Sequence, residues 1–143
     1  MTKSVIRVLL GFDFGTKRIG VAVGQTVTQS ARPLETLKAQ QGIPQWPQVD
    51  KLIKVWQPDA LVVGIPLNMD GTEQPLTLLA QNFLNALKER YQLPVYGIDE
   101  RLSTVDARER IFEQGGYKAL KSGQIDSVAA QLILQNWLLQ YQQ

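Results

Sequence analysis

The pattern of hydrophobic and polar positions predicts short buried strands first and helices later in the chain. An apolar run at 5–14 (VIRVLLGFDF) is typical of a buried strand. After a turn, residues 19–24 alternate apolar side chains with glycine or alanine, so one face of this second strand is very small. Expected strands cover residues 5–14, 19–24, 30–37, 60–65 and 95–98. Expected helices, from apolar positions at helical spacing, cover residues 44–56, 73–90, 104–113 and 124–140.

The order of these elements predicts the fold class. Three strands come first, helices and strands then alternate, and two helices follow the last strand. This order indicates an α/β fold in which a three-stranded antiparallel meander and parallel strands share one mixed sheet, with helices packed on it. Pro33 fits an edge strand better than a central one. Thr72 is the expected N-terminal cap of the helix over 73–90.

Composition bounds the domain organisation. The chain has 143 residues, of which 44% are hydrophobic, so one compact domain spanning 1–143 with a real core is expected. No apolar run is long enough for a membrane span, and the N-terminus lacks the apolar segment of a signal peptide. We therefore expect a soluble cytoplasmic protein.

The chain contains no histidine and no cysteine, which narrows the chemistry available to it. Disulfides, thiol catalysis, thiolate zinc sites and imidazole bases are excluded. A metal site would have to be built from oxygen ligands, and oxygen ligands suit Mg²⁺, Mn²⁺ and Ca²⁺.

Three acidic residues stand at the expected ends of core elements. Asp13 ends the first strand, where Phe12 and Phe14 should face the opposite side of the sheet. A lone buried carboxylate there costs several kcal/mol. A cation, or backbone N–H groups of the turn at 15–17, would offset that cost.

The other two acids have comparable alternatives. Glu100 follows the strand over 95–98, and either it or Asp99 faces the Asp13 side; pairing with Arg101 is the alternative. Asp126 begins the last helix, where an Asp also serves as a cap or interacts with the helix dipole. If the three carboxylates converge, they would hold one or two divalent ions able to support phosphodiester hydrolysis.

Several cations in turns or beside these acids are candidate phosphate contacts. The net charge of +2 is small, and an ordinary solvated surface is the competing interpretation. The loop after the strand over 60–65 adds a polar candidate on the side where α/β proteins place their sites. The candidate nucleic-acid contacts are Lys17, Arg18, Asn68, Arg101, Lys118 and Lys121.

Four segments resemble the YqgF family, whose members are described as pre-16S rRNA nucleases and as Holliday-junction resolvases. They are GFDFGTKRIGVAVG, VVGIPLNMDGTEQP, DERLST and FEQGGYKALKSGQIDSVAAQLIL, and they span most of the chain. The resemblance implies an RNase H-like fold with a five-stranded mixed sheet flanked by helices. It also implies that Asp13, Glu100 and Asp126 are the catalytic, metal-binding acids, with Mg²⁺ or Mn²⁺ as the cofactor. No acid close after Asp126 provides the fourth ligand that RNase H-like nucleases often carry.

The function this implies is metal-dependent hydrolysis of structured nucleic acid, with processing of the 16S rRNA precursor in ribosome biogenesis favoured. Two alternatives remain at this point: a Holliday-junction-type DNA resolvase, and a non-catalytic nucleic-acid-binding assembly factor. The motif FDFGTK also resembles the first phosphate loop of sugar kinases and actin-like ATPases. Those proteins clasp ATP between two such domains, and 143 residues provide only one.

Overall fold

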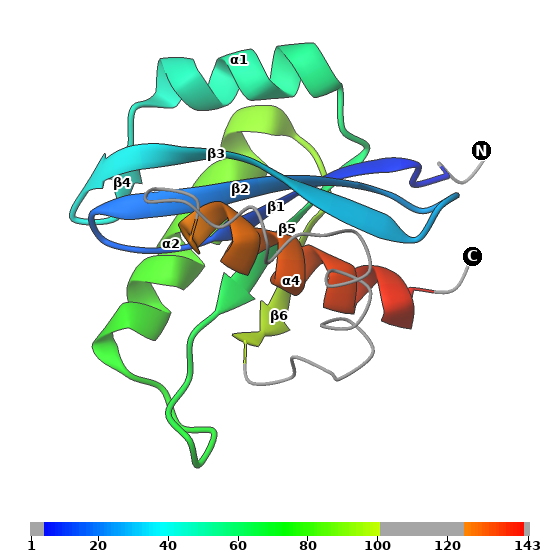
Figure 1. Ribbon diagram of the computed structural model, residues 1–143. Helices are drawn as coiled ribbons and strands as arrows, with labels where there is room; N and C mark the ends of the chain where they lie inside the picture. The colour runs from blue at the N-terminus through cyan, green and yellow to red at the C-terminus, as the bar shows by residue number, and fades with distance from the viewer. Residues whose placement is uncertain (1–4, 101–124, 142–143) are drawn as a thin grey trace.

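A six-stranded mixed sheet forms the centre of the computed structural model, which describes residues 5–100 and 125–141 (Figure 1). The strands are β1 (Val8–Asp13), β2 (Arg18–Gln25), β3 (Ser30–Gln40), β4 (Ile43–Pro44), β5 (Ala60–Ile65) and β6 (Val95–Asp99). They lie in the order β4-β3-β2-β1-β5-β6, with β1 to β4 antiparallel and β5 and β6 parallel to β1. The described helices are α1 (Trp46–Trp56), α2 (Pro75–Tyr91) and α4 (Ile125–Gln140).

The mixed sheet with flanking helices confirms the predicted class, but the expected count of five strands was wrong. The third strand continues to Gln40, and the chain then turns back at Gly42, whose φ of 83° suits glycine. This turn allows Ile43 and Pro44 to pair with the end of β3 as the sixth strand. A two-residue strand is too short to produce a periodic pattern. The helix expected at 104–113 lies outside the described residues.

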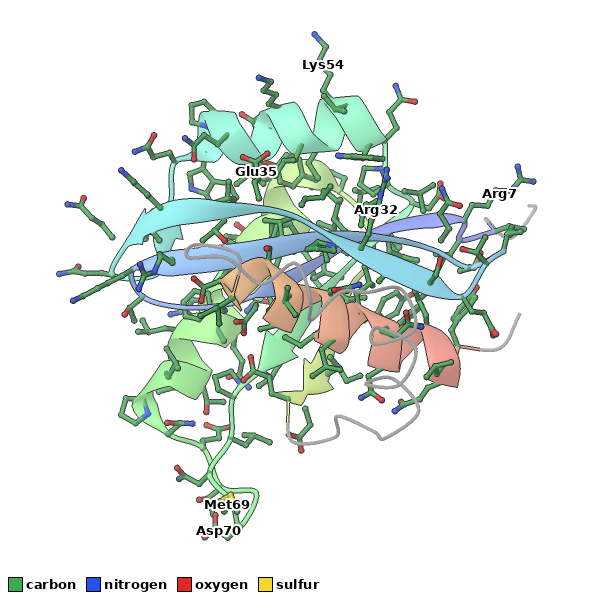
Figure 2. The ribbon with its side chains drawn as sticks, in the orientation of Figure 1. Arg7, Arg32, Glu35, Lys54, Met69 and Asp70 are labelled. Atoms are coloured by element: carbon green, nitrogen blue, oxygen red, sulfur yellow. The ribbon has the colours of Figure 1, made fainter. Side chains whose placement is uncertain are left out.

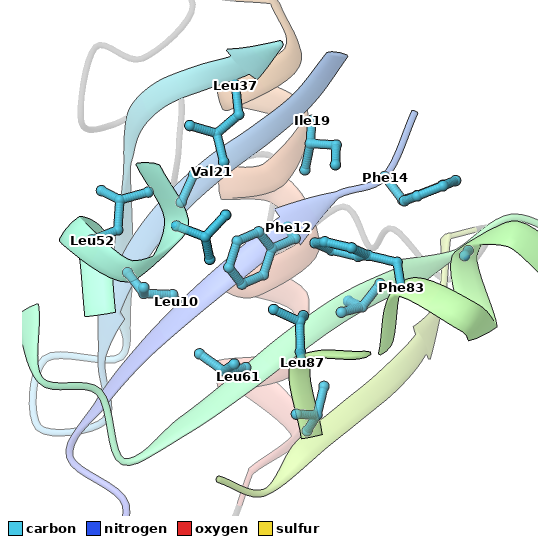
Figure 3. Close-up of a cluster of buried hydrophobic side chains, with 14 of the residues drawn as sticks. Leu10, Phe12, Phe14, Ile19, Val21, Leu37, Leu52, Leu61, Phe83 and Leu87 are labelled. Carbon is cyan, nitrogen blue, oxygen red and sulfur yellow. The ribbon is translucent and has the colours of Figure 1, made fainter. Parts of the chain in front are cut away.

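The sheet separates two hydrophobic cores. Helices α1 and α2 cover one face, where Phe12 and Phe14 pack against Phe83 with ring centroids 5.5 Å apart in both pairs (Figure 3). Helix α4 covers the other face and buries Leu134 and Leu138 there (Figure 1). The central strands therefore supply alternate residues to the two cores.

Helix α4 lies unusually close to the sheet because glycines line its path. A Cβ atom at Gly11 would be 2.8 Å from Leu134 Cβ, and one at Gly24 would be 2.9 Å from Leu138 Cδ1. The amide groups of two buried glutamines also join α4 to β3. Gln131 Nε2 donates to the Ala31 carbonyl at 2.9 Å, and Gln135 Oε1 accepts from the Ala31 N–H at 3.2 Å.

The segment between β5 and α2 differs from the expected capping. Gln74, not Thr72, caps α2, and its N–H donates to Thr77 Oγ1 at 3.0 Å. Thr72 instead donates its N–H and hydroxyl to Asp70 Oδ1, at 3.0 and 2.6 Å, because an Asx turn forms in the loop. Among the helices described, none is long and apolar enough to cross a lipid bilayer.

Candidate active site

Asp13 occupies the last position of β1, between two glycines on the neighbouring strands. Its register partners are Gly20 on β2 and Gly64 on β5. Since Phe12 and Phe14 face the core under α1 and α2, the alternation of the strand turns Asp13 toward the α4 side. The absence of side chains at the two glycines leaves space around its carboxyl group.

Glu100 reaches the same place from the end of β6. A Cβ atom at Gly64 would lie 2.9 Å from both Glu100 Cγ and Glu100 Oε1, so the Glu100 side chain passes directly over Gly64. Because Gly64 is also the register partner of Asp13, the two acidic side chains meet, and each carboxyl group influences the pKa of the other. Two strands that are distant in the sequence thus build one carboxyl pair.

The surroundings of this pair disfavour the ionised form of both carboxyl groups. Burial raises the pKa of Asp13 to about 8, with further contributions from the negative charge of Glu100, the hydrogen bond to Glu100 and the charge of Asp126. Burial also raises the pKa of Glu100. The hydrogen bond from Asp13 opposes that rise, and the charge of Asp99 adds to it. Two half-buried carboxyl groups in contact cannot both ionise cheaply unless a cation joins them.

Asp126 lies in the first turn of α4, against β2. A Cβ atom at Gly20 would overlap the Asp126 carbonyl oxygen, so only glycine allows the helix to begin here. The Asp126 carboxylate is 3.6 Å from the guanidinium Nε of Arg18. Its charge still acts on Asp13, which places it near the carboxyl pair.

These residues fit a hard divalent cation in donor type and charge. Carboxylate oxygens are the ligands that Mg²⁺ and Mn²⁺ prefer. Glu100 Oε1 is buried and has no hydrogen-bond partner in the described part of the protein. Within residues 5–100 and 125–141, however, no three acidic groups already form a ligand cluster. Only Asp13 and Glu100 are therefore in contact in the structure. To join them as a third ligand, the Asp126 carboxylate would have to leave Arg18 and turn toward the cation.

A small cavity next to Glu100 contains a polar residue that sequence reasoning missed. The cavity of about 30 Å³ is lined by Ile98, Asp99, Glu100, Leu132, Ile133 and Asn136. The Asn136 side chain is 2% exposed, and within the described residues its Oδ1 atom has no hydrogen-bond partner. The only signal in the sequence was an amide side chain within the mostly apolar pattern of the last helix.

The remaining candidate residues differ in where they lie relative to Asp13. Lys17 and Arg18 are exposed at the turn that follows Asp13. Asn68 instead holds the loop after β5, because its Nδ2 donates to Thr72 Oγ1 at 3.0 Å; this loop extends to Met69 and Asp70, well away from the sheet (Figure 2). Arg101, Lys118 and Lys121 lie outside the described residues.

The raised pKa of Asp13 predicts an unusual dependence of stability on pH. Between about pH 4 and about pH 8 the folded state holds a proton on Asp13 that the unfolded state releases, so the free energy of unfolding should fall as the pH rises through this window. In EDTA, the melting temperature of the wild type should therefore increase as the pH is lowered from about 8 to about 5. The variant Asp13→Asn should show a weaker trend, to which Glu100 still contributes, as measured by thermal melts of both proteins across the window. An unchanged trend in the variant would contradict the assignment to Asp13.

Solved structures show which fold the chain shares with known proteins. RuvC of T. thermophilus in complex with a Holliday-junction substrate superimposes with a TM-score of 0.58 at 18% identity, covering 91% of each chain. The fowlpox virus Holliday-junction resolvase has a TM-score of 0.57 at 13% identity, covering 94% of this chain and 99% of that one. At these identities the likeness concerns the fold, which is the RNase H-like fold with a RuvC-type sheet.

Sequence relatives define the family. Residues 7–140 match the family model described as "RuvX: Holliday junction resolvase", and the chain belongs to this family. The resemblance to YqgF proteins is thereby confirmed. A protein of Aeromonas hydrophila named "Putative pre-16S rRNA nuclease" is 58% identical over 92% of this chain and 94% of its own length. One of the same name from Actinobacillus pleuropneumoniae is 60% identical over 92% of this chain and 96% of its own.

Proposed function

We propose that this chain is a divalent-metal-dependent nuclease that hydrolyses phosphodiester bonds in structured nucleic acid. Its substrate is the 16S rRNA precursor, and it acts in the cytoplasm as a single domain over residues 1–143. The observation that carries the proposal is the half-buried carboxyl pair of Asp13 and Glu100 at the ends of two strands. Such a pair is costly for the fold and has a clear use in binding a cation. Relatives named as pre-16S rRNA nucleases, nearly 60% identical, support the choice of substrate.

Each site residue has a role that follows from its position. Asp13, Glu100 and Asp126 would hold Mg²⁺ or Mn²⁺, which supplies Lewis-acid activation of the attacking water and of the phosphate. Arg18 neutralises Asp126 in the structure, and its guanidinium is free to contact a phosphate once Asp126 turns to the cation. Lys17 lies in the same exposed turn and contributes a second positive charge.

A Holliday junction is the second candidate substrate, favoured by the description of the family. Symmetric cleavage of a four-way junction requires two active sites related by a twofold axis, hence a dimer. The RNA substrate requires no such symmetry. Oligomeric state in solution therefore bears directly on the choice between the two.

The test is cleavage of two labelled substrates, a 16S rRNA precursor fragment and a four-way DNA junction, with Mg²⁺, Mn²⁺ or EDTA. Metal-dependent cleavage of the precursor alone is expected. Cleavage of the junction alone would transfer the activity to DNA. Binding of the precursor with no cleavage of either substrate in any metal would replace the nuclease with a non-catalytic assembly factor.

A further inference from the structure

A row of exposed cations continues from the active-site turn onto β3. Arg18 on β2 and Lys38 on β3 are direct register partners, and Lys17 precedes Arg18. Like charges placed directly opposite each other on a sheet are destabilising. In the described part of the chain the ion pairs are Arg18 with Asp126 and Arg90 with Asp50, so neither Lys17 nor Lys38 takes part in one. The cations thus concentrate positive potential without stabilising the fold.

Lys38 also lies on the same face of the sheet as Asp13. Leu37 points into the core under α1 and α2, so its neighbour Lys38 points to the α4 side, as Asp13 does. Counting two strand spacings of about 4.8 Å and two residues of about 3.3 Å places Lys38 roughly 10–12 Å from Asp13. This distance spans about three nucleotides of one strand.

Next to Lys38 the β3–β4 hairpin forms an open groove of about 750 Å³. Its lining combines four polar side chains, those of Lys38, Gln40, Gln41 and Gln45, with the apolar residues Ala39, Ile43 and Pro44. Ile43 is 62% exposed. One cation and three amides are groups that bind a phosphodiester backbone without reading its sequence.

The hairpin is fixed to the turn that carries the active site. The Ala39 N–H donates to the Lys17 carbonyl at 2.8 Å, and the Gly42 N–H donates to the Thr16 carbonyl at 2.9 Å. A Cβ atom at Gly42 would be 2.5 Å from Phe14 Cζ, so the hairpin also rests on the residue that follows Asp13. Figure 1 shows β4 and the first turn of α4 at the same end of the sheet. A nucleic-acid strand bound in the groove would therefore be held in a fixed position relative to Asp13.

We propose that this groove, headed by Lys38, binds the phosphate backbone of the nucleic-acid strand a few nucleotides from the bond that is cut. The proposal rests on the proposed function of the Asp13 site and deepens it. Lys38 acts as a positioning residue: its ammonium contacts a phosphate and not the reacting atoms. Because phosphates carry no base or sugar identity, RNA and DNA strands should use the groove equally.

The first test is binding of a fluorescein-labelled RNA oligonucleotide and of a DNA oligonucleotide of the same sequence. All proteins carry Asp13→Asn, so that binding is measured without cleavage, and salt is varied. Lys38→Gln should weaken binding about 3–10-fold at low salt and reduce the slope of log affinity against log salt by about 0.7. The matched control is Lys54→Gln on α1, where the side chain points away from the sheet (Figure 2), and it should change neither quantity.

A second pair of variants tests the groove itself. Ile43 and Val55 are 62% and 63% exposed, in the groove and on α1 respectively, so both accept a polar side chain without loss of core packing. Ile43→Glu should weaken binding of both oligonucleotides by repelling phosphate, and Val55→Glu should not. Thermal melts of all variants check that each is folded.

The outcomes separate this proposal from the nuclease function. Equal losses on RNA and DNA with Lys38→Gln and Ile43→Glu, and none with the α1 variants, support the groove even if wild type cleaves nothing. Losses no larger than those of the α1 controls would overturn the groove even if wild type cleaves the precursor. A loss on RNA alone would show a contact to the sugar and would also overturn the phosphate assignment.

Discussion

Replacing Asp13 with Asn should lower the rate of cleavage of the preferred substrate about a thousandfold or more, while the protein stays folded. A thousandfold loss corresponds to about 4 kcal/mol of transition-state stabilisation. That is within the several kcal/mol that a correctly held divalent ion supplies. An amide keeps the shape of the side chain but removes the charge that would bind the cation. The measurement is the single-turnover cleavage rate with saturating Mg²⁺ or Mn²⁺.

Because of the electrostatics of the carboxyl pair, a loss of cleavage can be distinguished from a loss of stability. Burial and the neighbouring acids disfavour the ionised form of Asp13, so Asp13→Asn should melt no lower than wild type in EDTA at about pH 8. Glu100→Gln should behave likewise. The matched control is Glu35→Gln, an exposed acid on β3, which should retain the wild-type rate. Wild-type cleavage by Asp13→Asn, with the metal requirement intact, would remove Asp13 from the site.

Local sequence patterns were sufficient to predict the elements that carry the acids. The apolar run ending at Asp13 predicted β1, and alternation on either side of it predicted which way the acid faces. The alternation in the second strand predicted one very small face, and in the structure α4 packs closely against that face. The resemblance to a known family was needed to choose Glu100 over Asp99, because alternation alone left either acid facing the site.

Other features depend on contacts between distant segments, which no local pattern encodes. The side chains of Asp13 and Glu100 meet because β1 and β6 both flank β5, a neighbour relation set by the whole sheet. Lys38 joins Arg18 only through the β2–β3 register, after a β-bulge shifts that register near Pro33. The residue pattern predicts a third strand that ends at residue 37, one position too early to include Lys38, whereas β3 continues to Gln40.

The close approach of α4 to β2 leads to the second large prediction, which concerns Gly20. A methyl group at Gly20 would overlap the Asp126 carbonyl and approach the Ser127 backbone nitrogen to 2.8 Å. These are backbone atoms of the first turn of α4 and have no rotamer to escape into. Gly20→Ala should therefore push this end of the helix away from the sheet, at a cost of about 1–3 kcal/mol in the free energy of unfolding.

Activity should fall further than stability in Gly20→Ala, because the displaced turn carries Asp126. A misplacement of about 1 Å in a catalytic group can cost about a hundredfold in rate. Gly24→Ala on the same strand is the matched control: its methyl group would meet Leu134 Cδ2 and Leu138 Cδ1 at 2.9 Å, and these side-chain ends can move aside. We expect Gly24→Ala to retain most of its cleavage rate and to melt well above Gly20→Ala. The measurements are the free energy of unfolding in urea and the cleavage rate of both variants. Equal values for the two variants would show that α4 does not need glycine at position 20 to place Asp126.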